Sequence, residues 1–238
     1  MISELKDVLF LDIETVATTD SYAALDERLK TQWARKASFL KREEHQTDED
    51  LFHNRAGIYA EFGKIICIGV AKFVQLESGE LGMRTKAYYG HDEGVLLAEF
   101  KAMIERLDPM YEKLCAHNGK EFDFPYICRR MLVNGIPLPA LLNLAGRKSW
   151  EVPHIDTMEM WKFGDYKHYT SLDLLAAIFD IPSSKSDIDG SQVNKVYHID
   201  HDLEKIKNYC LRDVVVLAQL YLKMKCLDLV KAHNIQVG

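Results

Sequence analysis

The chain has 238 residues, and 30 lysines and arginines against 36 aspartates and glutamates give it a formal net charge of −6. A length of this order fits one large domain or two small ones. The composition, 47% hydrophobic and 28% charged, is that of an ordinary globular protein and excludes collagen-like, low-complexity and wholly disordered chains. The acidic balance argues against a protein that coats nucleic acid by bulk charge, although it leaves room for a local basic groove.

Five cysteines are spread along the chain without a C-x-x-C pair, so the sequence offers no zinc ribbon or redox motif. Residues 1–7 lack the basic stretch that opens a signal peptide. The longest apolar runs, such as Ile65–Ala71, are far too short to cross a bilayer. We therefore expect a cytoplasmic protein in a reducing compartment.

The first part of the chain alternates between apolar runs and a charged segment. Val8–Leu11 is a short apolar run that ends in charged residues, which is typical of a buried central strand. Residues 21–61 are dense in charge and helix-forming residues, and we expect a helical insertion with too little apolar content for a core of its own. Lys64–Phe73 and Met83–Tyr89 predict two further strands, which form a meander with the first.

The rest of the chain alternates between short strands and helices. Apolar periodicity predicts strands at Leu114–Ala116 and His154–Met158, and helices at Glu93–Leu107, Phe124–Val133, from Thr170 onwards and at Asp202–Leu229. Three strands followed by strand–helix alternation predict a mixed α/β sheet. We expect one domain over residues 1–238 with the helical insertion at 21–61.

Asp12 and Glu14 directly follow the first buried strand. Residues two apart on a strand face the same side, so both carboxylates project together while Ile13 turns away. Two like charges at the edge of an apolar core are costly unless a cation or hydrogen-bond donors lie between them. Taken alone, such a pair is more often a solvated strand end that leads into a loop than a metal site.

A second polar cluster, residues 117–123, lies between a short strand and a helix. Asp123 stands where the N-cap of that helix belongs, so capping alone would account for it. The alternative is that Asp123 supplies a carboxylate at the edge of the sheet and that Asn118 offers its amide to a polar ligand.

A third cluster lies on the last long helix. Tyr209 and Asp213 are four residues apart and share one helix face, which continues through the apolar residues Val216 and Leu220. Asp213 therefore interrupts a stripe that is expected to be buried. A buried aspartate needs a partner or a metal, and an ion pair with a nearby arginine is the alternative to a metal.

The three clusters together place four carboxylates and a phenol in positions that can converge. Asp12, Glu14, Asp123 and Asp213 are hard oxygen ligands, and a set without histidine or cysteine suits Mg²⁺ or Mn²⁺. In a nuclease, such a site holds two cations about 3.5–4 Å apart, which stabilise the attacking and leaving oxygens of an in-line displacement.

These motifs resemble those of a known family. Phe10–Thr15, His117–Asp123 and Tyr209-x-x-x-Asp213 are similar, in order and internal spacing, to the three motifs of DnaQ-like 3′–5′ exonucleases of the DEDDy group. Within that group the chain most resembles stand-alone exonucleases related to the proofreading domain of family B DNA polymerases, also through Lys64–Gly69 and Ser171–Val193. The likeness spans nearly the whole chain except residues 21–61.

The resemblance implies a ribonuclease H-like fold, with a mixed five-stranded sheet of three antiparallel and two parallel strands flanked by helices. It also implies that Asp12, Glu14 and Asp213 hold a first divalent cation, that Asp12 bridges to a second, and that Asp123 assists the second. Tyr209 would orient the attacking water, because a phenol with a pKa near 10 stays mostly protonated at neutral pH.

The implied substrate is the 3′ end of single-stranded DNA, from which 5′-mononucleotides are released. Thr15, Asn118, Phe122 and Tyr169 are the candidate substrate-binding residues, because single strands are held by polar contacts and by stacking on aromatic side chains. The neighbouring basic pairs Arg129-Arg130 and Arg147-Lys148 are candidate phosphate contacts.

Two alternatives stay open. The same chemistry on RNA would make the chain an exoribonuclease, which depends on whether the pocket accepts a 2′-hydroxyl. A non-catalytic nucleic-acid-binding module is disfavoured because all four carboxylates are present. A polymerase or repair partner acting in trans is the expected setting, and the oligomeric state is left open.

Overall fold

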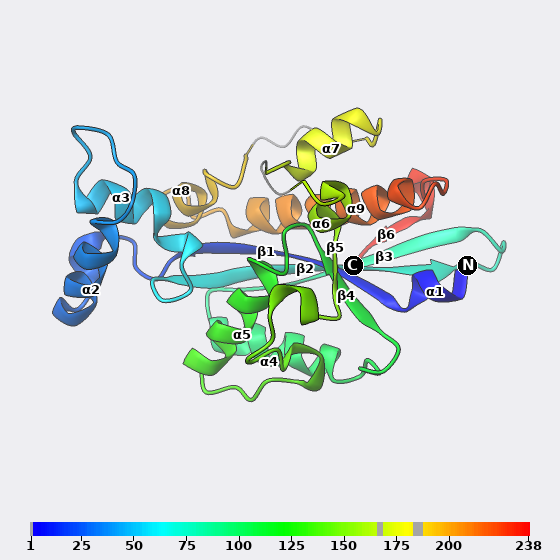
Figure 1. Cartoon of the computed structure of the whole chain (residues 1–238), viewed down its shortest axis with the longest axis horizontal. Coiled ribbons are helices and arrows are strands. Elements are labelled where there is room, and N and C mark those ends of the chain that lie inside the picture. The colour runs from blue at the N-terminus through cyan, green and yellow to red at the C-terminus, as the bar shows by residue number, and fades with distance from the viewer. Residues whose placement is uncertain (1, 166–168, 183–187) are drawn as a thin grey trace.

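The computed structural model describes residues 2–165, 169–182 and 188–238, and its centre is a six-stranded mixed sheet in the order β5-β4-β1-β2-β3-β6 (Figure 1). The strands are β1 (Val8–Ala17), β2 (Gly63–Gln75), β3 (Leu81–Tyr89), β4 (Lys113–Ala116), β5 (Ile155–Asp156) and β6 (Ile235–Val237). The first three form an antiparallel meander, while β4 lies parallel to β1 and β5 parallel to β4.

The expected count of five strands is wrong by one. The sixth strand, β6, pairs in parallel with Met83–Thr85 of β3 at the edge of the sheet. Its three residues carry no alternating pattern long enough to be distinguished from a loop. The remaining five strands have the three-antiparallel, two-parallel arrangement that was expected.

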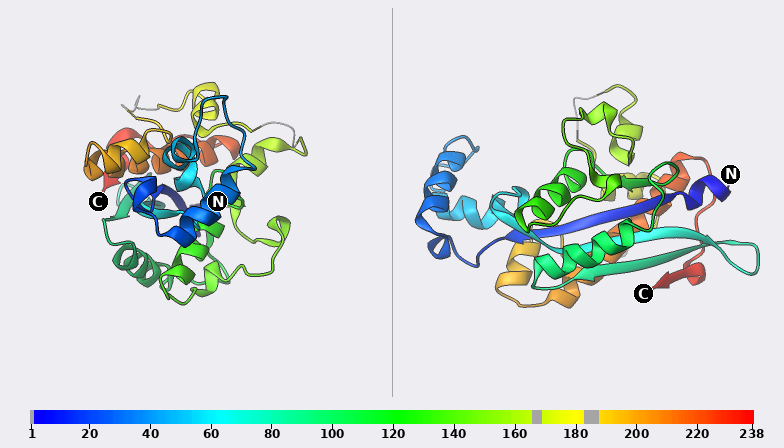
Figure 2. Two further views of the ribbon diagram at one scale, coloured as in Figure 1. Left: turned by 90° about the vertical axis from the view of Figure 1, so that its left-hand side faces the viewer. Right: turned by 90° about the horizontal axis from the view of Figure 1, so that it is seen from below.

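Helices cover both faces of the sheet. On one face lie α4 (Glu93–Ile104) and α5 (Asp123–Val133), and on the other lies the long α9 (Leu203–Met224) with α6 (Thr157–Lys162), α7 (Leu172–Ile178) and α8 (Val193–His198) around it (Figures 1 and 2). The short α1 (Ile2–Lys6) precedes β1. None of the helices in the described ranges is long and apolar enough to span a membrane.

The alternation of β1 decides which face receives the acidic residues. Leu11 and Ile13 pack into the apolar cluster under α4 and α5, whereas Phe10 packs with Val214 and other α9 residues. Successive side chains on a strand point to opposite faces. Asp12 and Glu14 therefore share the face of Phe10 and project toward α9.

The segment 21–61 forms α2 (Glu27–Ala37) and α3 (Asp48–Arg55), which project beyond one end of the sheet (Figures 1 and 2). The expectation that this segment lacks an apolar core was wrong. Trp33, Leu51 and Phe52 are buried together, and the Trp33 indole also donates a 2.7 Å hydrogen bond to the carbonyl of Asp48. A few large aromatic residues supply the buried area that the overall composition obscured.

Two expected elements are shorter than the sequence indicated. The strand expected at His154–Met158 ends at Asp156, because the Asp156 carboxylate accepts hydrogen bonds from the N–H groups of Met158 and Glu159 and so caps α6. The last helix ends at Met224. Cys226 follows with a left-handed φ of 56°, which turns the chain back toward the sheet.

Candidate active site

Asp12 and Glu14 lie together beneath α9. One oxygen of each carboxylate and the Sγ of Cys210 lie within 4.8 Å of one another. Glu14 is only 6% exposed, and the surrounding strand residues are almost wholly buried. The sequence predicted that the two carboxylates project together, and the strand geometry produces that arrangement.

Cys210 is a member of this cluster that the sequence analysis missed. Its Sγ lies 3.5 Å from the carbonyl oxygen of Asp12 and 3.7 Å from the Asp12 Oδ2. Burial raises the pKa of the Cys210 thiol well above its usual value, so the thiol stays protonated and donates to these oxygens. Its position beside Tyr209 was the available signal, but a single cysteine in an apolar helix is normally a small core residue.

Gly69 on β2 permits this close approach of α9 to the sheet. A Cβ at this position would lie 2.9 Å from the Sγ of Cys210 and 3.1 Å from its carbonyl oxygen. Any larger side chain would therefore push α9 away from β1 and β2. The glycine sets how near the residues of α9 come to the carboxylates of β1.

Tyr209 and Asp213 extend the site along α9. They lie one helical turn apart, and burial raises the pKa of Asp213 to about 6, against the lowering effect of the Tyr209 hydroxyl. Burial first, and then the charges of Asp213 and Glu14, raise the pKa of the Tyr209 phenol above its usual value. The phenol is therefore a hydrogen-bond donor across the whole physiological pH range.

Asp123 does not cap its helix. The residue before α5 is Phe122, and no side chain makes a capping hydrogen bond there. The Asp123 carboxylate is instead buried and near enough to Asp12 to raise the pKa of that residue. Burial is the main cause that raises the pKa of Asp123 itself to about 7, against hydrogen bonds from its own backbone and that of Ile13.

The electrostatics of this cluster fit a divalent cation. Burial and the charges of Asp123 and Asp213 raise the pKa of Asp12 well above its usual value, and burial and the charge of Asp12 do the same for Glu14. Within the described ranges, no lysine, arginine or histidine forms an ion pair with any of the four carboxylates. In their ionised form, buried carboxylates of this kind are stabilised by a positive charge among them, and oxygen donors suit Mg²⁺ or Mn²⁺.

The loop before Asp123 is held by a residue that the sequence analysis did not single out. Asp156 is 3% exposed, and its carboxylate accepts hydrogen bonds from the backbone N–H groups of Asn118 at 2.9 Å and Lys120 at 3.1 Å. The same carboxylate caps α6. One side chain therefore fixes the start of α6 against the loop that leads to Asp123.

His117 braces the same loop from its other side. Its Nε2 lies 2.8 Å from the carbonyl oxygen of Thr170 and must donate to it. Its Nδ1, 2.9 Å from the Thr157 hydroxyl, must then accept. Burial lowers the pKa of His117, which favours this neutral form.

The four candidate substrate-binding residues surround the carboxylates to different degrees. Asn118 has a left-handed φ of 62°, and its Oδ1 is buried without a hydrogen-bond partner. Tyr169 is 68% exposed. Partial burial, and then the charges of the nearby Asp123 and Asp12, raise the pKa of its phenol. Phe122 is half-buried against Tyr126, with ring centroids 5.4 Å apart, and Thr15 is half-buried on β1.

A β-bulge lies opposite Glu14 and Thr15. Glu14 pairs with Cys67 but Thr15 pairs with Ile65, so Ile66 is an extra residue on β2. Bulges bend a strand and redirect its side chains, and they are common beside active sites. This bulge lies at the end of β1 that carries the acidic residues.

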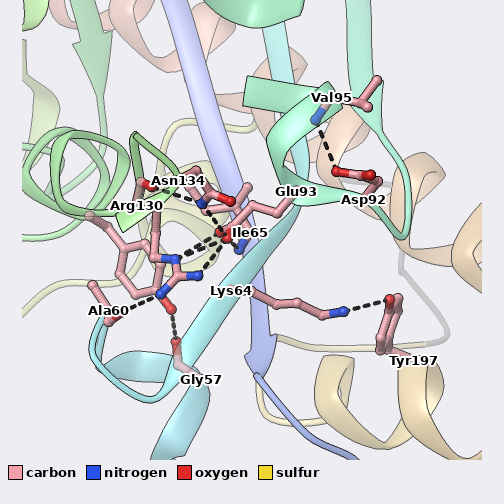
Figure 3. A network of polar contacts seen from close by, with 11 residues as sticks. Gly57, Ala60, Lys64, Ile65, Asp92, Glu93, Val95, Arg130, Asn134 and Tyr197 are labelled. Carbon is pink, nitrogen blue, oxygen red and sulfur yellow. Dashed lines mark hydrogen bonds and ion pairs between the residues drawn. The ribbon is translucent and has the colours of Figure 1, made fainter. Parts of the chain in front are cut away.

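A buried ion pair holds the β2 side of that bulge (Figure 3). Glu93, 7% exposed, accepts hydrogen bonds from the backbone N–H of Ile65 at 2.7 Å and from Arg130 Nη2 at 2.6 Å and Asn134 Nδ2 at 2.8 Å. Arg130 also donates to the carbonyl of Ala60 at 2.9 Å. Arg130 is thus buried and fully engaged, and it does not reach a phosphate as the sequence suggested.

Comparisons with known proteins agree with this geometry. A family model described as a predicted 3′–5′ exonuclease related to the exonuclease domain of PolB matches residues 58–232, which contain Asp123, Tyr209 and Asp213 but begin after β1. No curated protein matches the chain.

A family B DNA polymerase from the hyperthermophilic archaeon Pyrobaculum calidifontis has a similar fold, with a TM-score of 0.54 and 15% sequence identity. The match covers 91% of this chain and 24% of the polymerase, so the chain spans about a quarter of that protein. The mixed sheet with helices on both faces is a ribonuclease H-like fold, as the resemblance implied.

The family model covers well over half of the 238 residues. An enzyme of this kind acts on nucleic acid and uses divalent metal ions, which agrees with the chemistry of the carboxylate cluster. The chain therefore belongs to the family of 3′–5′ exonucleases related to the exonuclease domain of PolB.

Proposed function

We propose that this exonuclease removes 5′-mononucleotides from the 3′ ends of single-stranded DNA by a two-metal-ion mechanism of the DEDDy type. The supporting observation is the buried carboxylate cluster of β1, α5 and α9, which forms no ion pair within the described ranges. Burial is the largest cause that raises the pKa of each of these four carboxyl groups. We take all 238 residues as one exonuclease domain with a helical insertion at 21–61.

Asp12, Glu14, Asp123 and Asp213 would hold two divalent cations, Mg²⁺ or Mn²⁺. Such cations supply the positive charge that stabilises the attacking and leaving oxygens of the phosphodiester. The Cys210 thiol donates to Asp12 and so orients that carboxylate within the cluster. Gly69 keeps α9 at the distance that this contact requires.

Tyr209 is the residue that we assign to the attacking water. Its phenol stays protonated, so it orients the water by hydrogen bonding and does not remove a proton from it. It lies one helical turn from Asp213 on α9, beside the carboxylates that would hold the cations. The buried and unpartnered Oδ1 of Asn118 is suited to accept a hydrogen bond from the 3′-terminal sugar, while the exposed ring of Tyr169 is suited to stack on the terminal base.

The test is degradation of 3′- and 5′-labelled oligonucleotides of DNA and RNA in Mg²⁺, Mn²⁺ or EDTA. We expect progressive shortening from the 3′ end of single-stranded DNA, release of 5′-mononucleotides, and no digestion in EDTA. Digestion that persists in EDTA would contradict the metal-dependent mechanism. Faster digestion of RNA than of DNA would contradict the proposed substrate but not the chemistry.

We place the activity in DNA repair or in proofreading for a separate polymerase, in the cytoplasm. The likeness to a polymerase exonuclease fold supports this setting. Excision of a mismatched 3′ terminus ahead of extension by an added polymerase is the assay, and equal excision of matched and mismatched termini would argue for general turnover of single strands.

A further inference from the structure

A hollow of about 270 Å³ lies on the outer face of α5, away from the sheet. Pro125, Arg129 and Leu132 of the helix form one wall, and Leu144 and Arg147 of the segment that follows form part of the other. The lining is thus largely apolar with two guanidinium groups. Leu144 also packs against the core cluster under α5, but the carboxylate cluster uses none of these side chains.

The hollow begins beside the active site. Lys120, in the loop that leads to Asp123, contributes to its lining, and so does Leu132, which lies on α5 nine residues after Asp123. The stretch from Pro125 to Leu132 rises by about 10 Å along the helix axis. A strand that left the carboxylate cluster around the N-terminus of α5 would enter this hollow within a few nucleotides.

The hollow is locally basic in an acidic chain. Residues 120–152 contain five basic and three acidic residues, while the whole chain carries −6. Arg130 is neutralised by Glu93, Lys120 by Glu159, and Asp123 belongs to the carboxylate cluster, so three basic residues face two acidic ones, 3 − 2 = +1. Within the described ranges Arg129 and Arg147 are exposed and form no ion pair with a carboxylate.

An aromatic platform stands at the rim. Trp150 is 73% exposed, and its neighbour Ser149 lines the hollow. The Nζ of Lys148 lies 5.1 Å from the centroid of the Trp150 ring, which leaves a large flat apolar surface next to a positive charge. Apolar walls, unpaired arginines and an exposed tryptophan are the combination by which proteins hold single-stranded nucleic acid without reading its sequence.

We propose that this hollow is a second binding subsite, which holds the substrate strand beyond the two nucleotides nearest the 3′ end. Arg129 and Arg147 contact its phosphates, and Trp150 stacks on a base. The inference rests on the proposed function, because it identifies the occupant as the upstream part of the same strand.

The first test is binding in EDTA, which requires no turnover. Fluorescence anisotropy measures the affinity of a 20-nucleotide single-stranded DNA for the wild type, for the double variant Arg129→Gln with Arg147→Gln, and for Trp150→Ala. We expect the arginine double variant to bind at least 10-fold more weakly. Its log–log salt slope should fall by about 1.4, the value for two lost contacts to single-strand phosphates.

The matched control is Arg28→Gln with Arg35→Gln. Both residues are exposed on α2, beyond the far end of the sheet, and the double change alters the net charge equally, from −6 to −8 (Figure 1). This control should bind the oligonucleotide within about twofold of the wild type, as expected when local contacts rather than bulk charge carry the interaction.

The second test is turnover of a short and a long substrate. With Mn²⁺, the arginine double variant should cleave a dinucleotide as fast as the wild type but show a KM for the 20-mer at least 10-fold higher. Equal weakening in the α2 control, unchanged 20-mer affinity, or equal loss on the dinucleotide would overturn the subsite. A wild type that binds the 20-mer through these arginines without cleaving it would support the subsite and refute the proposed activity.

Discussion

At the scale of single residues, the acidic groups of β1 stand in an unfavourable state without a cation. Burial and neighbouring charge raise the pKa of Asp12 and Glu14 because the ionised forms are desolvated and repel one another. Under the proposed function, a bound cation would recover the free energy that this arrangement costs the folded protein. Function and stability are therefore opposed at these positions.

The variant Asp12→Asn should lower activity and raise stability, and so separate these two properties. We expect turnover to fall by about 10³-fold or more, as for a loss of roughly 4 kcal/mol of transition-state stabilisation. In EDTA at pH 8 the same variant should melt at a higher temperature than the wild type, because a buried acidic group that is desolvated and repels its neighbours when ionised is removed. Calorimetry and oligonucleotide digestion measure the two effects. The exposed Asp20→Asn should change neither, and a destabilised Asp12→Asn would contradict the assigned electrostatics.

Tyr209→Phe tests the orienting role of the phenol. The variant keeps the ring and removes only the hydroxyl, so we expect kcat to fall by about 10²-fold with little change in the cation concentration for half-maximal activity. Titration of Mn²⁺ into digestion assays gives both values. A parallel loss of cation affinity would mean that Tyr209 acts by placing Asp213.

At the scale of elements, the site depends on loops and helix ends that are fastened together. The carboxylate of Asp156 joins the loop of Asn118 and Lys120 to the first turn of α6. Asp156→Ala leaves those buried N–H groups without an acceptor and should cost about 2–4 kcal/mol of unfolding free energy in urea, with a lower kcat as well. Glu159→Ala, which removes only the partly exposed ion pair with Lys120, should cost less than about 1 kcal/mol.

The buried ion pair beside the bulge opposite Glu14 can be tested in the same way. Glu93→Ala leaves Arg130 as a buried charge without its ion-pair partner and leaves the N–H of Ile65 without an acceptor. The free energy of unfolding in urea should therefore fall by about 3–5 kcal/mol. The double variant Glu93→Leu with Arg130→Met removes both charges and should recover much of that stability. A double variant as unstable as Glu93→Ala would show that the backbone contact to Ile65 dominates.

At the scale of the whole molecule, the carboxylate cluster determines how stability depends on pH. Asp123 and Asp213 have pKa values of about 7 and about 6 in the folded state, above the unfolded values near 4. Raised carboxyl pKa values contribute stability below pH 4 that is lost as the pH rises through 6 to 7. In EDTA, Tm should therefore fall by an amount on the order of 5 °C between pH 5 and pH 8.

Saturating Mn²⁺ should reverse this trend, because cations bind the ionised carboxylates and add about 2.7 kcal/mol at 100 times Kd. Differential scanning calorimetry across the pH range measures both profiles. The alanine variant of Asp123 should have a flatter profile in EDTA. A wild-type Tm in EDTA that rises steadily from pH 5 to pH 8 would contradict the raised pKa values.

The features that could be predicted from the sequence are those that depend on residues close to one another along the chain. The antiparallel meander, the strand-end carboxylates and the shared helix face of Tyr209 and Asp213 follow from patterns within a few residues, and the family model confirms the resemblance. The partner of Arg130 did not follow, because Glu93 lies 37 residues away. Likewise, the acceptor role of Asp156 depends on N–H groups 36 and 38 residues earlier, which no local pattern indicates.

The three-residue strand β6 has a consequence for behaviour in concentrated solution. The margins of the sheet are β5, with two residues, and β6, with three, while the long strands β1 and β2 lie inside. Long exposed margins are templates for intermolecular strand pairing, and very short ones are poor templates. Val237→Pro, which would weaken the pairing of Thr85 with Val237, should therefore promote self-association of the folded enzyme at high concentration before it lowers nuclease activity.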